Sequence, residues 1–132
     1  MPKSYLIAAA FSGMAAVILG AFGAHGLRGH LSPELMTIYQ TGVQYHFYHT
    51  LGLLAVAVML RQWPGSKALR WSGNLFLIGI IIFSGSLYLL SFTGMRWFGA
   101  ITPIGGLAFI VAWLMMLVAV WRDSNGGGKR PS

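Results

Sequence analysis

Four long apolar stretches divide this chain, and they constrain its fold more than any other feature. They cover residues 5–23, 45–60, 71–93 and 100–121. A helix of about 20 apolar residues crosses the hydrocarbon core of a bilayer. The second stretch is shorter than this, but it reaches the required length together with the partly polar residues that precede it. Hydrophobic residues make up 56% of the chain and charged residues 8%, which is outside the usual range of soluble domains. The sequence therefore predicts an all-α membrane protein with four transmembrane helices in one domain, residues 1–121.

The second predicted helix begins with a clear start signal. Ser32 can cap free backbone N–H groups, Pro33 needs no N–H donor in a first turn, and Glu34 suits the positive end of the helix dipole. No proline follows until Pro64. A helix that continues to residue 60 is about 40 Å long, which exceeds the roughly 30 Å of hydrocarbon that it must cross.

The periodicity of this segment separates two faces. Polar side chains from Thr37 to Tyr48 form one stripe, while His46 and His49 share the opposite face with apolar residues. We expect residues 33–44 to lie as an amphipathic helix at the external face of the membrane, followed by the span 45–60.

Positive charges gather at one end of the predicted helices. Lys3, three side chains within 61–70 and three within 122–132 lie on one side, against Arg28 and Arg96 on the other. The positive-inside rule then places both termini in the cytoplasm. This distribution explains the net charge of +7 by topology and contact with anionic lipid, so the lipid bilayer and not nucleic acid is the predicted partner. The Gly-rich basic segment 122–132 is predicted to be a disordered tail.

The first stretch has a second interpretation as a signal peptide, because a short basic start precedes it and small residues follow it. Its apolar run exceeds the usual signal-peptide core, so we interpret residues 5–23 as a helix. Small residues recur along it at four-residue spacing, which favours close packing against a neighbouring helix. Whether this segment is cleaved stays open at this stage.

The residue inventory excludes several kinds of chemistry. The chain has no cysteine, which removes disulfides, thiol nucleophiles and thiolate metal sites. Glu34 and Asp123 are its two acidic residues, so a catalytic carboxylate pair or a calcium cage lacks its parts. No ionisable residue lies in the centre of the first, third or fourth span, which argues against a conduction pathway.

The histidines allow three interpretations. His46 and His49 are three residues apart on one face and could bind a metal or haem together with His25 or Glu34, although two ring nitrogens do not complete a zinc site. In a simpler alternative, each histidine donates to a carbonyl or a neighbouring hydroxyl. The third is a lipid headgroup or quinone held between helices by histidine and Thr102. Its aromatic walls would come from Tyr39, Tyr45, Tyr48 and Trp97.

Four ordered sequence blocks carry a family resemblance over nearly the whole chain. The blocks are Gly20-Ala21-Phe22-Gly23-Ala24-His25, Gln40-Thr41-Gly42 with Tyr45 and His49, Phe83-Ser84-Gly85-Ser86-Leu87-Tyr88, and Thr102-Pro103-Ile104-Gly105-Gly106. On these blocks the chain resembles the uncharacterised family of YgdD-like small four-helix bacterial inner-membrane proteins. The resemblance implies a multi-pass plasma-membrane protein without an assigned reaction. It also implies that His25 and His49 occupy motif positions of the family, whereas the position of His46 is commonly glutamine. The resemblance therefore favours a polar contact between His25 and His49 over a metal site built from His46 and His49.

We therefore predict a multi-pass inner-membrane protein of unassigned biochemical function, either a non-enzymatic accessory or a ligand-binding protein. The alternatives are a histidine-based redox, metal or quinone-binding subunit and a small-solute transporter. No catalytic residue, metal or cofactor is assigned, and a second copy or another membrane protein is left open as a partner. The candidate external polar cluster consists of His25, His49, His46, Gln40, Tyr45 and Thr102.

Overall fold

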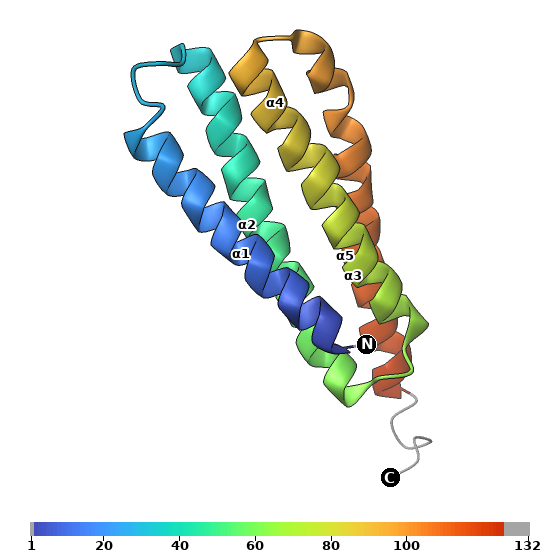
Figure 1. Ribbon diagram of the computed structural model, residues 1–132. Helices are drawn as coiled ribbons and strands as arrows, with labels where there is room; N and C mark the ends of the chain where they lie inside the picture. Colours follow the sequence, from blue (N-terminus) through green and yellow to red (C-terminus); the bar gives the residue numbers. More distant parts are fainter. Residues whose placement is uncertain (1, 126–132) are drawn as a thin grey trace.

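Four helical rods run up and down the molecule (Figure 1). The structure is a computed structural model and describes residues 2–125, in which every regular element is helical. The elements are α1 (Pro2–His25), α2 (Pro33–Gln62), α3 (Lys67–Gly79), the π-helical turn η1 (Ile80–Ser84), α4 (Gly85–Thr93), the 3₁₀ turn η2 (Arg96–Ala100) and α5 (Thr102–Asn125). The third rod combines α3, η1 and α4. All four rods are long and apolar enough to cross a membrane, which confirms the predicted all-α architecture with four spans.

The helix-start signal of α2 works as its residues suggest. The Ser32 hydroxyl accepts a hydrogen bond from the Leu35 N–H at 3.2 Å, and Pro33 occupies the first turn. α2 then continues without a break for 30 residues, through the predicted amphipathic segment and the predicted span. Its first turns pack beside α4, where the Ser91 hydroxyl, which donates to the Leu87 carbonyl of its own helix at 2.7 Å, also lies 3.3 Å from the Leu35 carbonyl.

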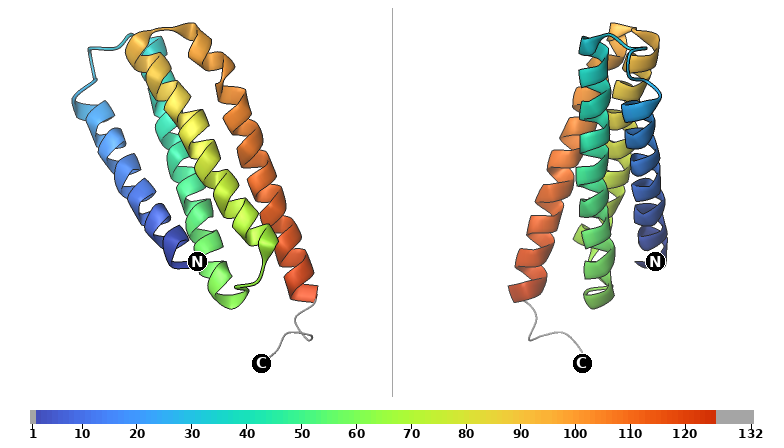
Figure 2. Two further views of the ribbon diagram at one scale, coloured as in Figure 1. Left: turned by 45° about the vertical axis from the view of Figure 1, so that its right-hand side comes forward. Right: turned by 90° about the vertical axis from the view of Figure 1, so that its left-hand side faces the viewer.

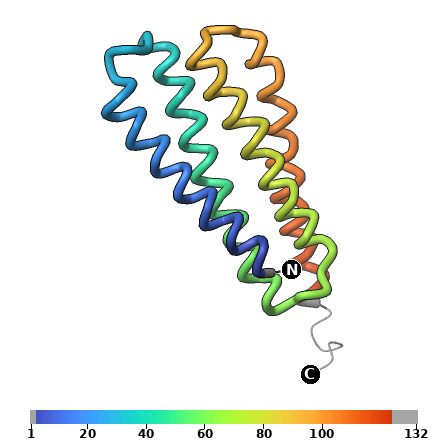
Figure 3. Tube along the Cα trace, in the orientation of Figure 1, coloured from blue at the N-terminus to red at the C-terminus, as the bar shows by residue number. Residues whose placement is uncertain are grey.

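α2 and the third rod form the centre of the molecule. α1 packs on α2, and α5 packs mainly on α3 and η1, so α1 and α5 lie on opposite sides of α2 (Figure 2, right). The N-terminus, the α2–α3 loop and the end of α5 lie together at one end of the bundle, and the loops after α1 and α4 lie at the other (Figure 3). At this second end, the Arg96 guanidinium donates to Glu34 at 2.8 Å between two exposed side chains, a contact that stabilises little.

The small residues of α1 allow it to approach α2 closely. Ala9 and Ala16 are buried, and a methyl group on Gly23 would overlap the Tyr39 ring. The Tyr39 hydroxyl crosses this interface and donates to the Leu19 carbonyl. Since lipid gives helices no hydrophobic reason to associate, this close packing and the interhelical hydrogen bond hold α1 to α2.

α5 approaches the π-helical turn closely through Gly105. A methyl group on Gly105 would overlap the backbone of Phe83, and nearby the Ser84 hydroxyl donates across to the Gly42 carbonyl of α2 at 2.7 Å. η1 is therefore the place where the third rod meets both α2 and α5.

The predicted disordered tail begins at 122, whereas α5 continues to Asn125. The rest of the predicted tail, 126–132, lies outside the described residues.

Candidate functional site

The six residues of the predicted polar cluster do not form one group. His25 is exposed at the end of α1, and Gln40 is exposed on α2. Thr102 begins α5, with its hydroxyl 2.6 Å from that of Ser86. The remaining three lie together on α2, where Tyr45 and His49 face Phe109 of α5 and His46 faces α1 and α4. The structure thus separates His25 from His49, which is buried among aromatic rings.

His46 and His49 also lie deeper than predicted. Both are near the midpoint of the 30-residue α2, and the ring of His46 contacts Ser12 near the midpoint of α1. The prediction placed them at the external end because polar residues from Thr37 to Tyr48 precede and surround them. In the structure those polar residues form a stripe on the outer surface, so the polarity marks one face of α2 and not a depth.

His46 is the centre of a buried hydrogen-bond network. Its Nε2 lies 3.1 Å from the Ser12 hydroxyl, and its Nδ1 lies 2.9 Å from the Tyr88 hydroxyl. Ser12 is in turn 2.6 Å from the Thr50 hydroxyl, which donates back to the His46 carbonyl at 2.7 Å. The network joins α1, α2 and α4 in the middle of the bundle.

The direction of each hydrogen bond in this network follows from counting hydrogens. The Thr50 hydroxyl gives its one hydrogen to a carbonyl, so it accepts from Ser12. The Ser12 hydroxyl has then used its hydrogen and accepts from His46 Nε2–H. Neutral His46 therefore keeps a lone pair on Nδ1 and accepts from the Tyr88 hydroxyl. Every polar atom of the ring has its partner.

His49 has a different environment on the α5 side. Its Nδ1 lies 2.7 Å from the Tyr45 carbonyl, which can only accept, so Nδ1 carries the hydrogen. The ring stacks on Phe109 with centroids 3.5 Å apart and planes 6° from parallel, and Trp113 meets it edge-on. Neutral His49 thus has a lone pair on Nε2, and no hydrogen bond to that atom is present among the described residues.

The rings of His46 and His49 do not converge on one position in this arrangement. His46 turns both ring nitrogens to hydroxyl groups of α1 and α4, while His49 stacks against α5. Among the described residues, no three histidine or acidic side chains are grouped closely enough to hold a metal ion. The simpler alternative describes the contacts correctly, with His46 donating to a hydroxyl and His49 to a carbonyl.

His49 lines a groove of about 500 Å³ between α2, η1 and α5. Its walls are mainly aromatic and aliphatic, and His49 itself is 7% exposed. The lining residues are Tyr45, His49, Phe83, Pro103, Gly106, Leu107, Phe109, Ile110 and Trp113. Because Leu107 and Ile110 are exposed on the outer surface of α5, the groove opens toward the surroundings of the bundle.

Several residues that build these sites were not predicted from sequence, among them Ser12, Thr50, Phe109 and Trp113. Ser12 is the one serine or threonine in the stretch 5–23, and this isolation was a usable signal of a buried polar contact. Phe109 and Trp113 are four residues apart and share a helical face, as the structure shows. Which helix that face meets could not be predicted from spacing alone.

The fold and these two buried polar sites define the class: a small polytopic membrane protein whose helices enclose histidines in the middle of the bundle. Comparison with known proteins then gives the family. A family described as "protein of unknown function (DUF423)" matches residues 19–106, two thirds of the chain, and the protein belongs to this family. This agrees with the resemblance seen in the sequence blocks.

The relatives cover nearly the whole chain. The UPF0382 membrane protein YwdK of Bacillus subtilis is 48% identical over 117 residues, which are 89% of this chain and 95% of YwdK. The UPF0382 inner membrane protein YgdD of Escherichia coli is 40% identical over 122 residues, 92% of each chain. No solved structure matches the chain. The protein is thus a multi-pass membrane protein of a family whose biochemical function is unassigned.

Proposed function

We propose that this protein is a non-enzymatic membrane protein that binds a lipid-soluble ring compound carrying a hydroxyl group, in the groove between α2 and α5. The free acceptor atom of His49 supports this proposal. The Tyr45 carbonyl fixes the hydrogen of His49 on Nδ1, which leaves the Nε2 lone pair of a nearly buried histidine free to accept a hydrogen bond. This atom is accessible from the groove, where lipid tails offer it no hydrogen bond and a ligand hydroxyl does.

The groove suits a flat ring. Its volume of about 500 Å³ falls within the range of small-molecule sites, roughly 300–1,000 Å³. Aromatic rings of Tyr45, Phe83 and Trp113 line it, and such walls favour stacked or edge-on contacts with another ring. Because the groove opens at an apolar surface of α5, a ligand dissolved in the bilayer can reach it from the side.

The acceptor character of His49 selects the oxidation state of a quinone-type ligand. A quinol has hydroxyl donors, whereas the oxidised quinone has only carbonyl acceptors and leaves Nε2 without a partner. We therefore name the quinol as the ligand class. The role is binding, because the contacts that support it are one hydrogen bond and ring packing.

The test is an equilibrium titration of the purified protein in lipid nanodiscs with decyl-ubiquinol and with decyl-ubiquinone. We expect the quinol to bind about tenfold more tightly, because one additional hydrogen bond contributes on the order of 1.4 kcal/mol. His49→Phe keeps a ring against Phe109 and removes the acceptor, so this variant should lose the preference for the quinol.

The matched control is Phe11→Ala, which removes an exposed ring from the cleft on the other side of α2, next to His46. It should leave both affinities unchanged. Equal affinities of the wild-type protein for quinol and quinone, or a preference that persists in His49→Phe, would overturn the proposal.

We also propose that the chain lies in the inner, or plasma, membrane with both termini in the cytoplasm. The end of the bundle that holds the N-terminus and the α2–α3 loop is rich in positive charge, and such ends face the cytoplasm. The opposite end carries Arg28 and Arg96. The positive side chains of the first end are Lys3, Arg61, Lys67, Arg70 and Arg122. The name of the Escherichia coli relative, an inner membrane protein, supports this location.

A further inference from the structure

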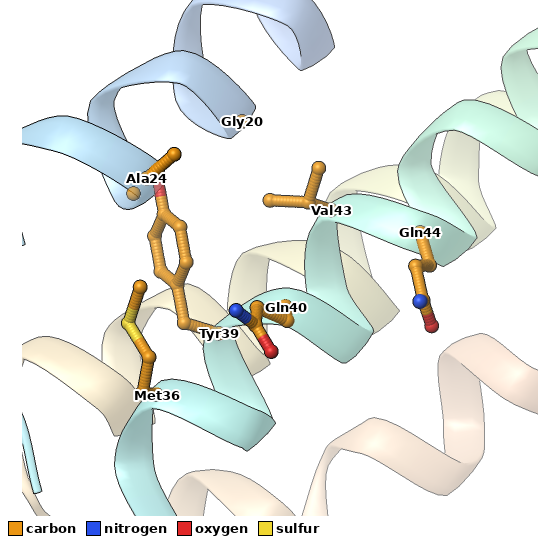
Figure 4. Close-up of a pocket in the computed structure, with 8 residues that line it drawn as sticks. Gly20, Ala24, Met36, Tyr39, Gln40, Val43 and Gln44 are labelled. Atoms are coloured by element: carbon orange, nitrogen blue, oxygen red, sulfur yellow. The ribbon is translucent and has the colours of Figure 1, made fainter. Parts of the chain in front are cut away.

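A row of polar side chains faces outward from α2. Thr37, Gln40, Gln44 and Tyr48 are all exposed and follow one another at three- or four-residue spacing. Thr37 satisfies its hydroxyl within the helix by donating to the Pro33 carbonyl. The side chains of Gln40 and Gln44 make no hydrogen bond to any described residue. Figure 4 shows Tyr39 reaching from α2 to α1, whereas Gln44 extends away from α1.

These glutamines lie at the level of an apolar belt. The α1 residues opposite them are Leu19, whose carbonyl accepts from Tyr39, and Gly20, which faces Val43. On the outer surface of α1, Ile18 and Phe22 flank this level and are exposed.

α4, which packs on another side of α2, also exposes apolar side chains at the level of Gln40 and Gln44. Gly42 lies against Leu87 and Tyr88, and the next turn of α4 exposes Leu89 and Phe92. The neighbours of both glutamines therefore present apolar side chains at this level, and Gln40, at the edge of the belt, also lines a hollow with Arg28.

An amide at this depth needs a partner. Lipid tails offer no hydrogen bond, and unpaired polar groups in hydrocarbon are costly. Side chains such as glutamine commonly form hydrogen bonds between helices inside membranes.

We propose that a second copy of this chain covers the row, with α2 packed against α2 around a two-fold axis along the membrane normal. A two-fold axis sets each residue near its own copy, and a glutamine amide is self-complementary because it both donates and accepts. Beside Gln40 and Gln44, a hollow of about 390 Å³ lined in part by Gly20, Gly23 and Ala24 leaves room for a side chain of the second copy. This inference does not depend on a ligand in the groove at His49.

The experiment uses the absence of native cysteine in the chain. Thr37→Cys places a single thiol on the row and keeps both glutamines, and Leu89→Cys places one on the exposed surface of α4 at a similar depth. Membranes that contain each variant of the full chain are treated with a short bis-maleimide. We expect a cross-linked dimer from Thr37→Cys and none above background from Leu89→Cys.

The glutamines are tested within the cross-linking variant. Adding Gln40→Leu and Gln44→Leu to Thr37→Cys should weaken dimerisation about tenfold or more, measured by native mass spectrometry over a range of protein concentrations in mild detergent. These surface changes replace polar by apolar groups facing lipid, so folding is retained.

Three outcomes overturn the proposal. They are equal cross-linking of Thr37→Cys and Leu89→Cys, a dimer that persists without the glutamines, and a cross-link from Thr37→Cys to a different protein in place of a second copy. Quinol binding is measured separately, so its failure would leave the dimer intact, and failure of the dimer would leave the groove intact.

Discussion

His46 and His49 are three residues apart on one helix, yet they hold their hydrogens on opposite ring nitrogens. The difference comes from their neighbours. A chain of hydroxyl groups ending at a carbonyl forces His46 to donate from Nε2, and the Tyr45 carbonyl forces His49 to donate from Nδ1. His46 is satisfied on both sides and stabilises the packing of three helices, whereas His49 retains a free acceptor. Of these two histidines, His49 is the one whose ring can accept a further hydrogen bond.

This difference predicts the nitrogen-15 spectrum of the histidine side chains. The chain contains four histidines, so His46 and His49 can be assigned by single substitutions. In the ligand-free protein, we expect the hydrogen on Nε2 in His46 and on Nδ1 in His49. The same tautomer for both rings, or a hydrogen on Nδ1 of His46, would contradict the hydrogen-bond directions.

The helix positions of both histidines could be predicted from sequence, but their contacts could not. Periodicity correctly assigned them to the buried face of α2. The partners Ser12, Tyr88 and Phe109 come from three other helices, and the order in which those helices pack is not encoded in the spacing within α2. The polar stripe from Thr37 to Tyr48 also suggested a position near the end of the bundle, whereas both histidines lie near the middle of α2.

At the scale of the helices, Gly105 and Gly106 have different roles although they are adjacent. A methyl group on Gly105 would overlap the backbone of Phe83, which cannot move without displacing η1. A methyl group on Gly106 would lie 3.8 Å from the Phe83 ring, an ordinary contact. Gly105 thus sets the distance between α5 and the third rod.

We expect Gly105→Ala to lower the free energy of unfolding by about 1–3 kcal/mol through overpacking. Gly106→Ala is the matched control and should be neutral or stabilising, since alanine favours a helix by up to about 1 kcal/mol over glycine. Reversible unfolding in mixed micelles measures both values. Equal effects of the two substitutions would show that the close approach at Gly105 does not control the α5 interface.

The helix pattern itself was largely readable from sequence. The four apolar stretches and the Ser32-Pro33-Glu34 start signal correspond to the rods that the structure contains. The π-helical turn η1 was not predicted, because its residues Ile80–Ser84 read as an ordinary part of an apolar helix. The turn lines the groove through Phe83, so part of the candidate site was also not predictable.

For the whole molecule, the distribution of charge predicts its orientation in the membrane. This orientation can be tested with single introduced cysteines, because the chain has no native cysteine. Two exposed loop positions lie at opposite ends of the bundle: His30 between α1 and α2, and Gly65 between α2 and α3. With a membrane-impermeant maleimide, intact spheroplasts should label His30→Cys, and Gly65→Cys should react only after lysis. The reverse pattern would place the termini outside.

The molecule as a whole combines two features on either side of α2: a satisfied polar network on the side of α1 and α4, and an unsatisfied acceptor in the groove beside α5. The first stabilises the bundle, and the second is the ligand site that we propose. The two sides of α2 differ at a single atom, the Nε2 of His49, which has no hydrogen-bond partner among the described residues.

The most direct measurement is the side-chain nitrogen-15 spectrum of His49 during a titration with decyl-ubiquinol in nanodiscs. We expect a saturable shift of the Nε2 resonance with the hydrogen remaining on Nδ1, while the resonances of His46 stay unchanged. An Nε2 resonance that does not move at saturating quinol, or one that moves equally with the oxidised quinone, would contradict this expectation.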